Sequence, residues 1–251
     1  WAGWHATMPG CVVADMRLAW PLLLAGLALP ALALESVPGH FSSMPIGSVF
    51  TDGWQVLALR DTKPTQFSLV EEAGVPGVRV PADAAGGSLL RPIRWDPAGH
   101  PRLQWRWRVD RVVAQGDIHS KDGDDFAARL YVMFDYPTER LSFADRAKLA
   151  IARWIYGDQV PAAALCYVWD NHAEVGTRAW NAYTDRVRMI VLRNATSGVG
   201  DWMLEQRDLV ADYREAFGET PPPVSGIAIA ADTDQTGETV TAWFGDISIS
   251  D

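Results

Sequence analysis

The chain has 251 residues, of which 48% are hydrophobic and 21% charged, and its formal net charge is -9 at pH 7. An excess of acidic groups repels phosphate backbones and anionic lipid surfaces, which argues against binding to nucleic acid or to a membrane surface. The length suits one sizeable domain with its own hydrophobic core, and no internal repeat or long linker divides the sequence.

The first segment has the pattern of a secretory leader. Arg17 precedes an apolar run over residues 18–32, and small residues around Ala33 form a cleavage site. A membrane anchor is the weaker interpretation, because the run contains two prolines and is shorter than the roughly 20 residues of a spanning helix. We therefore expect an exported protein, periplasmic or secreted, without a membrane span after cleavage. Its predicted parts are upstream sequence at 1–15, a signal peptide at 16–33 and a single β-sandwich domain at 34–251.

Short strand-like runs separated by Gly, Pro and Asp turns fill the rest of the chain. The clearest is 103–110, where Leu103, Trp105, Trp107 and Val109 alternate with polar residues, so that one strand face is buried. Further strands are predicted at 55–59, 78–80, 126–134, 164–170, 186–193 and 202–206, and helices at 142–156 and 208–217. This pattern favours a mainly β, jelly-roll-like antiparallel sandwich, of the galactose-binding-like type, with one or two inserted short helices.

An acidic group, 121–125, stands directly before the predicted strand 126–134. Leu130 and the apolar residues at every second position after it form a core face of the strand, so the polar side chains between them point to the opposite face. An arginine there offers a fork of donors to hydroxyls or to a carboxylate. The alternative is a solvated loop with a structural ion pair. The predicted polar cleft contains Asp124, Asp125, Arg129 and Tyr131.

Aromatic residues suggest a second part of a binding site. Sugar rings stack their apolar faces on exposed aromatic planes, and their hydroxyls need carboxylate, amide or Arg partners. Tyr167 and Trp169 share one face of a predicted strand, Asn171 follows them, and Tyr183 lies in a similar mixture further on. These four residues are candidates for contact with a carbohydrate or another small polar ligand. The alternative for each large aromatic residue is a place in the core.

The last strands, within 224–250, flank an acidic turn at 232–238 and predict a β-hairpin. Asp232, Asp234 and Thr236 offer oxygen atoms at alternate positions, which makes the turn a candidate for a structural calcium ion. Two other interpretations stay open: a turn held by Asx hydrogen bonds, and direct contact with a ligand. A helix–loop–helix calcium loop does not fit, because the flanking segments are strands.

Signatures of a defined reaction are missing from the sequence. There is no G-x-S-x-G elbow, no phosphate-binding glycine loop and no pair of histidines at metal-ligand spacing. Cys166, within an apolar run, is expected to be a small buried side chain. A pair of Asp residues can still serve glycoside hydrolysis if the fold brings them together, with Asp124 and Asp232 as the first candidates.

Several motifs in order resemble one known family. They are WRWRV at 105–109, KDGDDFAARLYV at 121–132, YVW at 167–169, DY at 212–213 and the closing SGIAI and GDI segments. Together they are similar to the bacterial family called domain of unknown function three-zero-four-seven. The resemblance implies an exported β-sandwich similar to galactose-binding modules, and it supplies no catalytic residues.

From these observations we expect non-catalytic binding of a carbohydrate or a similar polar ligand. The first alternative is an enzyme acting on polysaccharide, of the glycoside hydrolase or lyase type, that uses an Asp pair. The second alternative is a structural subunit of an envelope assembly. A deep cleft with two carboxylates would favour the enzyme, a shallow aromatic strip the binding protein, and a large apolar patch the subunit.

Overall fold

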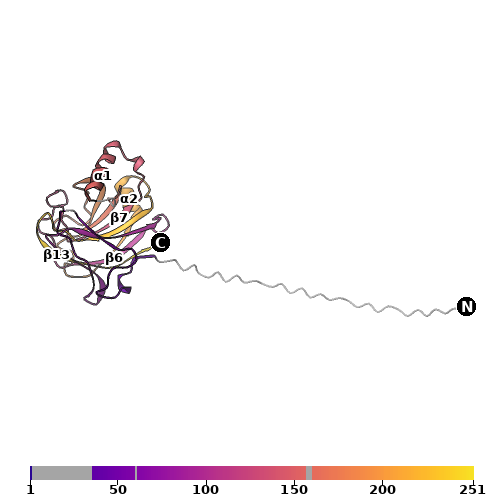
Figure 1. Ribbon diagram of the computed structural model, residues 1–251, viewed down its shortest axis with the longest axis horizontal. Coiled ribbons are helices and arrows are strands. Elements are labelled where there is room, and N and C mark those ends of the chain that lie inside the picture. The colour runs from indigo at the N-terminus through magenta and orange to yellow at the C-terminus, as the bar shows by residue number, and fades with distance from the viewer. Residues whose placement is uncertain (2–35, 60, 157–159) are drawn as a thin grey trace. The chain divides into compact units, whose positions relative to one another are not determined.

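The computed structural model describes Trp1 and residues 36–59, 61–156 and 160–251, in which strands dominate (Figure 1). Residues Ala33–Asp251 form one compact unit. The predicted upstream segment and signal peptide fall, apart from Trp1, outside the described residues and stay predictions. None of the helices in the described ranges is long and apolar enough to cross a membrane.

One layer of the fold is a six-stranded sheet. Its strands run in the order β11-β6-β13-β4-β3, and β1 pairs with β13 at the side of this path. All of its pairs are antiparallel. The strands are β1 (Ser36–Gly39), β3 (Ser68–Glu72), β4 (Val75–Asp83), β6 (Arg102–Val109), β11 (Met203–Asp208) and β13 (Thr239–Ser250).

The other layer is a seven-stranded sheet in the order β2-β5-β12-β7-β8-β10-β9. It is antiparallel except between β8 and β10, which run parallel. The strands are β2 (Gln55–Ala58), β5 (Gly87–Trp95), β7 (Ala128–Phe134), β8 (Ala164–Trp169), β9 (Arg178–Asn181), β10 (Thr184–Arg193) and β12 (Val224–Ala230).

The core lies between the two sheets and is rich in aromatic rings. On β6, Trp105 and Trp107 are buried, as the alternating pattern predicted, and the intervening arginines face outward or are only partly buried. The Trp105 ring lies 5.2 Å from that of Tyr167, and the Trp107 ring 5.7 Å from that of Trp169, measured between centroids. Because β6 and β8 belong to different sheets, these contacts join the two layers.

Two α-helices accompany the sandwich, as predicted. In α1 (Phe143–Tyr156), the Ser142 hydroxyl accepts a hydrogen bond from the Asp145 N–H at 3.0 Å, which caps the first turn. In α2 (Leu209–Phe217), Asp208 caps the start and Gly218, with φ of 74°, ends the helix in the left-handed conformation. Two short 3-10 helices are formed by Phe41–Ser43 and Thr138–Arg140.

The predicted β-hairpin at the end of the chain is wrong. Strand β12 pairs with β5 and β7 in the seven-stranded sheet, whereas β13 pairs with β4 and β6 in the six-stranded sheet. Residues 231–238, which we call the crossing turn, therefore connect the two layers. Two apolar runs around a polar turn are compatible with either arrangement, because each strand satisfies its backbone hydrogen bonds with other partners.

These two sheets confirm the predicted mainly β, jelly-roll-like sandwich with short helices. The parallel β8–β10 pair departs from the expected antiparallel order. After β8 the chain returns along β9, which pairs antiparallel with β10, so β10 runs in the same direction as β8. The assignment to the galactose-binding-like type remains a prediction.

Candidate functional site

A pocket of about 500 Å³ lies on the outer face of the seven-stranded sheet, on the side away from the aromatic core. The alternation along β7 places Leu130 and Val132 in the core and turns Arg129 and Tyr131 toward this pocket, as the sequence predicted. Helix α1 and the crossing turn supply further walls. The polar side chains that line the pocket include Asp124, Arg129, Tyr131, Lys148, Asn181, Tyr183, Arg186, Asp232 and Asp234.

Arg129 organises the floor of the pocket, and its side chain is only 2% exposed. Its Nε donates to Asp232 Oδ1 at 3.0 Å, and its Nη1 donates to Tyr131 Oη at 3.0 Å. Nη1 also contacts Asp124 Oδ1 at 3.4 Å, and Nη2 donates to the Asp124 carbonyl. The Phe126 ring lies beneath the guanidinium group, 4.4 Å from its central carbon. Two carboxylates, one hydroxyl and one ring thus hold a single orientation of the guanidinium group.

The amide of Asn181 extends this network toward the pocket wall. Its Nδ2 donates to both carboxylate oxygens of Asp124 at 3.2 Å, and its Oδ1 accepts from the Tyr183 N–H at 3.0 Å. The Tyr183 hydroxyl in turn donates to the Lys121 carbonyl at 3.2 Å. Tyr183 lines the pocket with 46% of its surface exposed, and Lys121 Nζ lies 5.1 Å from the centroid of its ring.

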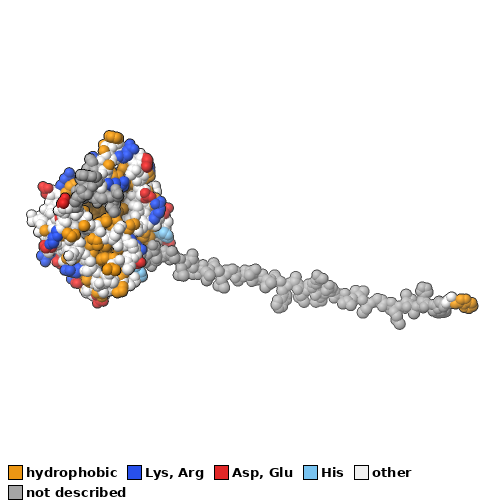
Figure 2. All heavy atoms as spheres, viewed as in Figure 1, with side chains coloured by type: hydrophobic (Ala, Val, Ile, Leu, Met, Phe, Trp, Pro, Cys, Tyr) orange, Lys and Arg blue, Asp and Glu red, His pale blue; other side chains and the backbone are white. Residues whose placement is uncertain are grey.

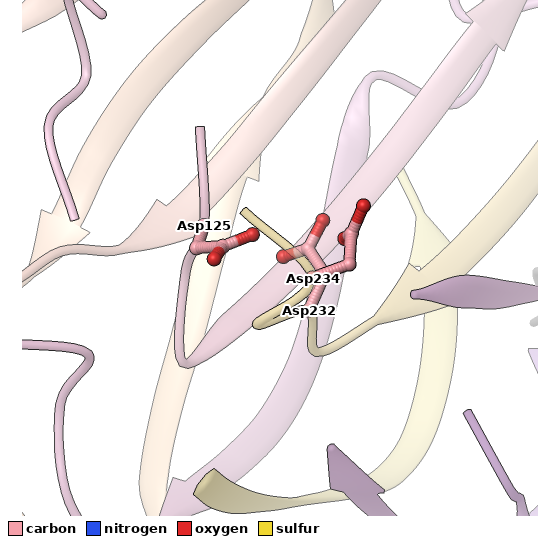
Figure 3. Close-up of side chains that lie close together, drawn as sticks. All are labelled: Asp125, Asp232 and Asp234. Atoms are coloured by element: carbon pink, nitrogen blue, oxygen red, sulfur yellow. The ribbon is translucent and has the colours of Figure 1, made fainter. Parts of the chain in front are cut away.

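Three carboxylates, those of Asp125, Asp232 and Asp234, lie within 4.8 Å of one another, measured between one oxygen of each (Figure 3). Asp125 ends the acidic loop before β7, and the other two residues belong to the crossing turn. Asp125 Oδ2 accepts hydrogen bonds from the N–H groups of Gln235 and Thr236 at 3.1 and 2.6 Å. The sequence therefore folds two distant acidic segments into one cluster.

Burial changes the acidity of these groups. Burial raises the pKa of Asp232 to about 7, and the Asp124 and Asp125 charges act in the same direction, while Arg129 opposes them. Burial and the Asp125 charge also raise the pKa of Asp234. For Arg129, burial lowers the pKa but the Asp124 and Asp232 charges outweigh it, so the guanidinium group stays charged. The cluster holds more negative charge than Arg129 balances.

The polar cleft that the sequence predicted exists in this structure. Asp124, Arg129 and Tyr131 line the pocket together with Tyr183. Asp125 lies beside them in the carboxylate cluster and is 1% exposed. Their contact with a ligand remains a proposal.

The predicted aromatic platform on β8 is wrong, because Tyr167 and Trp169 are fully buried in the core. In the β7–β8 register, Leu130 lies opposite Tyr167 and Ala128 opposite Trp169, so both rings share the core face of the sheet. The Tyr167 hydroxyl donates to Asp212 Oδ2 at 2.8 Å and thereby ties β8 to α2. Neither ring can stack on a sugar.

Asn171 has a different role from the one predicted, whereas the predicted metal contact of Thr236 stays a prediction. Asn171 is 6% exposed, and its Nδ2 donates to the carbonyls of Ala114 and Gly116 at 3.0 and 2.8 Å, so it fixes a loop. Thr236 reaches the carboxylate cluster through its backbone N–H, and its hydroxyl accepts a bond from the Glu238 N–H. The third carboxylate of the cluster comes from Asp125 instead.

Sequence reasoning missed the residues that α1 and β10 contribute to the pocket, among them Lys148 and Arg186. Both stand in polar stretches where nothing in the sequence separates a pocket wall from an ordinary solvated surface. Cys166 is buried as predicted, and burial raises the pKa of its thiol to about 12. It therefore stays protonated and unreactive at neutral pH.

The fold and the pocket define a class: a two-layer β-sandwich with a polar pocket on the outer face of one sheet. Residues 52–248 match the model of the family described as Protein of unknown function (DUF3047), and the chain belongs to that family. The resemblance inferred from the sequence motifs is thus confirmed. No curated protein matches the chain in sequence.

Solved structures with a similar fold include three sandwich enzymes. The xyloglucanase domain of NopAA, a type three effector from Sinorhizobium fredii solved with cellobiose, is 11% identical, with a TM-score of 0.42 over 82% of this chain and 98% of that one. Endoglucanase 3 of Trichoderma harzianum, from family GH12, is 8% identical, with a TM-score of 0.43 over 88% and 99%. The family 12 xyloglucanase of Bacillus licheniformis is 10% identical, with a TM-score of 0.42 over 86% and 99%.

Proposed function

We propose that the pocket on the outer face of the seven-stranded sheet binds a carbohydrate, or a similar ligand rich in hydroxyl groups. The observation that supports this proposal is the composition of the pocket. Its volume of about 500 Å³ lies in the range of small-molecule sites. Carboxylates, the Asn181 amide and two tyrosines face apolar wall residues such as Leu149 and Val187. That mixture suits hydroxyl groups and the apolar faces of sugar rings.

The charges around the pocket favour a neutral ligand. Acidic lining residues outnumber basic ones, and the most buried guanidinium group, that of Arg129, is already engaged by Asp124 and Asp232. An anionic sugar would meet net repulsion there. The acidic lining residues are Asp61, Asp124, Asp145, Asp185, Asp232 and Asp234, and the basic ones are Arg129, Lys148 and Arg186.

Calorimetric titration of the chain with neutral oligosaccharides of glucose, galactose, mannose and N-acetylglucosamine tests this proposal. We expect at least one sugar to bind, and Tyr183→Ala to weaken its binding about tenfold or more, since a lost stacking contact removes roughly 1 to 2 kcal/mol. Phe143→Ala is the matched control, because Phe143 is an exposed aromatic residue outside the pocket lining. Equal loss in both variants, or no binding by any sugar, would refute the proposal.

The second candidate is hydrolysis of a polysaccharide, which the geometry of two pocket carboxylates favours. Asp232 and Asp234 both line the pocket, and one oxygen of each lies within 4.8 Å of the other. That separation is shorter than the roughly 5 to 5.5 Å between the two carboxyl groups of glycosidases that retain configuration, so the pair would have to open slightly to serve this reaction. Release of reducing ends from a neutral polysaccharide, abolished in Asp234→Asn with binding retained, would establish this candidate in place of simple binding.

We also propose that the protein is exported to the periplasm or beyond the cell, on the basis of the leader pattern at residues 16–33. A protein that binds extracellular carbohydrate needs such a route. Mass spectrometry of the protein made with this leader should give a mature N-terminus within a few residues of Leu34. A product that keeps the apolar run 18–32 would contradict export by this signal.

A further inference from the structure

A buried carboxylate oxygen without a partner lies at the edge of the pocket. Asp125 is 1% exposed, and its Oδ2 accepts two backbone hydrogen bonds from the crossing turn. Its Oδ1 is buried and has no hydrogen-bond partner among the described residues. A buried carboxylate oxygen that accepts no hydrogen bond raises the free energy of the folded state, and a bound cation would remove that cost.

This carboxylate points toward two others. Figure 3 shows Asp125 directed from its loop toward Asp232 and Asp234 of the crossing turn, and one oxygen of each lies within 4.8 Å of the others. Two ligands of one calcium ion, each at about 2.3 to 2.6 Å, are separated by at most about 5 Å. The spacing is therefore that of oxygen atoms sharing one cation.

The local balance of charge also calls for a cation. Arg129 pairs with Asp232 and Asp124, whereas no Lys or Arg in the described part of the chain forms an ion pair with Asp125 or Asp234. Arg129 Nε and the Phe126 N–H both donate to Oδ1 of Asp232. Among the described residues, Arg129 is the one guanidinium group paired with this cluster, so ionisation of all three carboxylates in a mostly buried place needs a further positive charge.

The backbone around the cluster holds the three side chains in position. Thr233 is fully buried, its N–H donates to the Ala85 carbonyl at 2.9 Å, and its hydroxyl accepts from the Ala85 N–H at 3.3 Å. Gly86 leaves room for Asp234, since an added Cβ there would lie 2.7 Å from Asp234 Oδ1. The carboxylates are thus placed by packing before any ligand arrives, which lowers the entropy lost on binding.

We propose that Asp125, Asp232 and Asp234 form a binding site for a hard divalent cation of the calcium class. Such ions take carboxylate and carbonyl oxygens in flexible geometry, and this site supplies three carboxylates from two segments. The ion ties the loop before β7 to the crossing turn. This inference does not depend on carbohydrate binding, but an ion held by Asp232 and Asp234 excludes this pair from hydrolysis while it is bound.

The test is calorimetric titration of the metal-free full chain with calcium chloride, together with melting curves in calcium and in chelator. Extracellular calcium modules bind with dissociation constants of about 10⁻⁴ to 10⁻³ M, so we expect saturation below about 10 mM and a higher melting temperature in calcium. Asp125→Asn should weaken calcium binding by about tenfold or more, because it removes one charged ligand. Asp185→Asn is the matched control, since Asp185 is an exposed carboxylate of the same pocket outside the cluster.

Asp234→Asn is the second variant, and its calcium affinity tests the proposal if Asp125→Asn does not fold. Saturable calcium binding that is lost in the cluster variants and kept in Asp185→Asn would support the site. Absence of binding to the wild-type chain would overturn the proposal, and so would binding that the cluster variants keep. Sugar binding, measured separately in chelator, distinguishes failure of this proposal from failure of the proposed function.

Discussion

The two faces of the seven-stranded sheet differ in character, since the inner face belongs to the core and the outer face lines a polar pocket. On the inner face, Tyr167 and Trp169 are fully buried against the tryptophans of β6. On the outer face, Arg129 and Tyr131 of the neighbouring strand belong to a polar network around a pocket. On the face shown in Figure 2, apolar side chains gather near the middle of the domain and charged ones lie mostly around its edge. Alternate residues of adjacent strands thus belong to the core on one face and to the polar pocket on the other.

The largest effect should come from the inner face. Trp169→Ala removes a fully buried ring and the hydrogen bond from its Nε1 to the Asn194 carbonyl. The cavity should lower the free energy of unfolding by about 3 to 5 kcal/mol, measured by urea denaturation. Sugar binding by the folded fraction should not change. A loss of less than about 1 kcal/mol, together with lost binding, would reverse our assignment of the two faces.

The second largest loss of stability should come from removing the buried Arg129 charge on the outer face. Arg129→Met leaves Asp124 and Asp232 without their shared counter-ion, so we expect a loss of about 3 kcal/mol in urea denaturation. Arg94→Met is the control, because Arg94 and Asp135 form an ion pair in which both side chains are more than half exposed. The control should lose less than about 1 kcal/mol. Similar losses in the two variants would mean that the pocket floor is solvated.

A substitution at Asn171 tests whether this residue has a structural role or contacts the ligand. Asn171→Ala removes the two hydrogen bonds to the Ala114 and Gly116 carbonyls, and it should lower the free energy of unfolding by about 1 to 2 kcal/mol. Affinity for sugar should stay at the wild-type value. Weaker sugar binding with unchanged stability would return Asn171 to the list of ligand contacts.

The sequence predicted the strands whose two faces differ in polarity. On β6 and β7, apolar and polar residues alternate, so the buried face and the outward direction of Arg129 and Tyr131 could be inferred. All six residues of β8 are buried, because a second apolar cluster that includes Phe126 and Met189 covers its outer face. Polar and apolar residues therefore do not alternate along β8, and the sequence does not show which face carries Tyr167 and Trp169.

The sequence also did not predict which distant segments of the chain lie side by side. The acidic turn was predicted to close a hairpin, but its flanking strands belong to different sheets, since pairing partners are set by residues far away in the chain. For the same reason the sequence predicted the third oxygen ligand beside Asp232 and Asp234 at Thr236, four residues or fewer away. It comes from Asp125, more than a hundred residues earlier.

The central claim is that the outer face of the seven-stranded sheet is the binding face. Mapping of amide chemical shifts during titration with the tightest-binding neutral oligosaccharide tests it most directly. We predict that the largest shifts fall at Arg129, Tyr131, Asn181 and Tyr183, while the amides of β6 in the other sheet keep their positions. Shifts concentrated on β6 and β11, with the four pocket residues unmoved, would contradict the account.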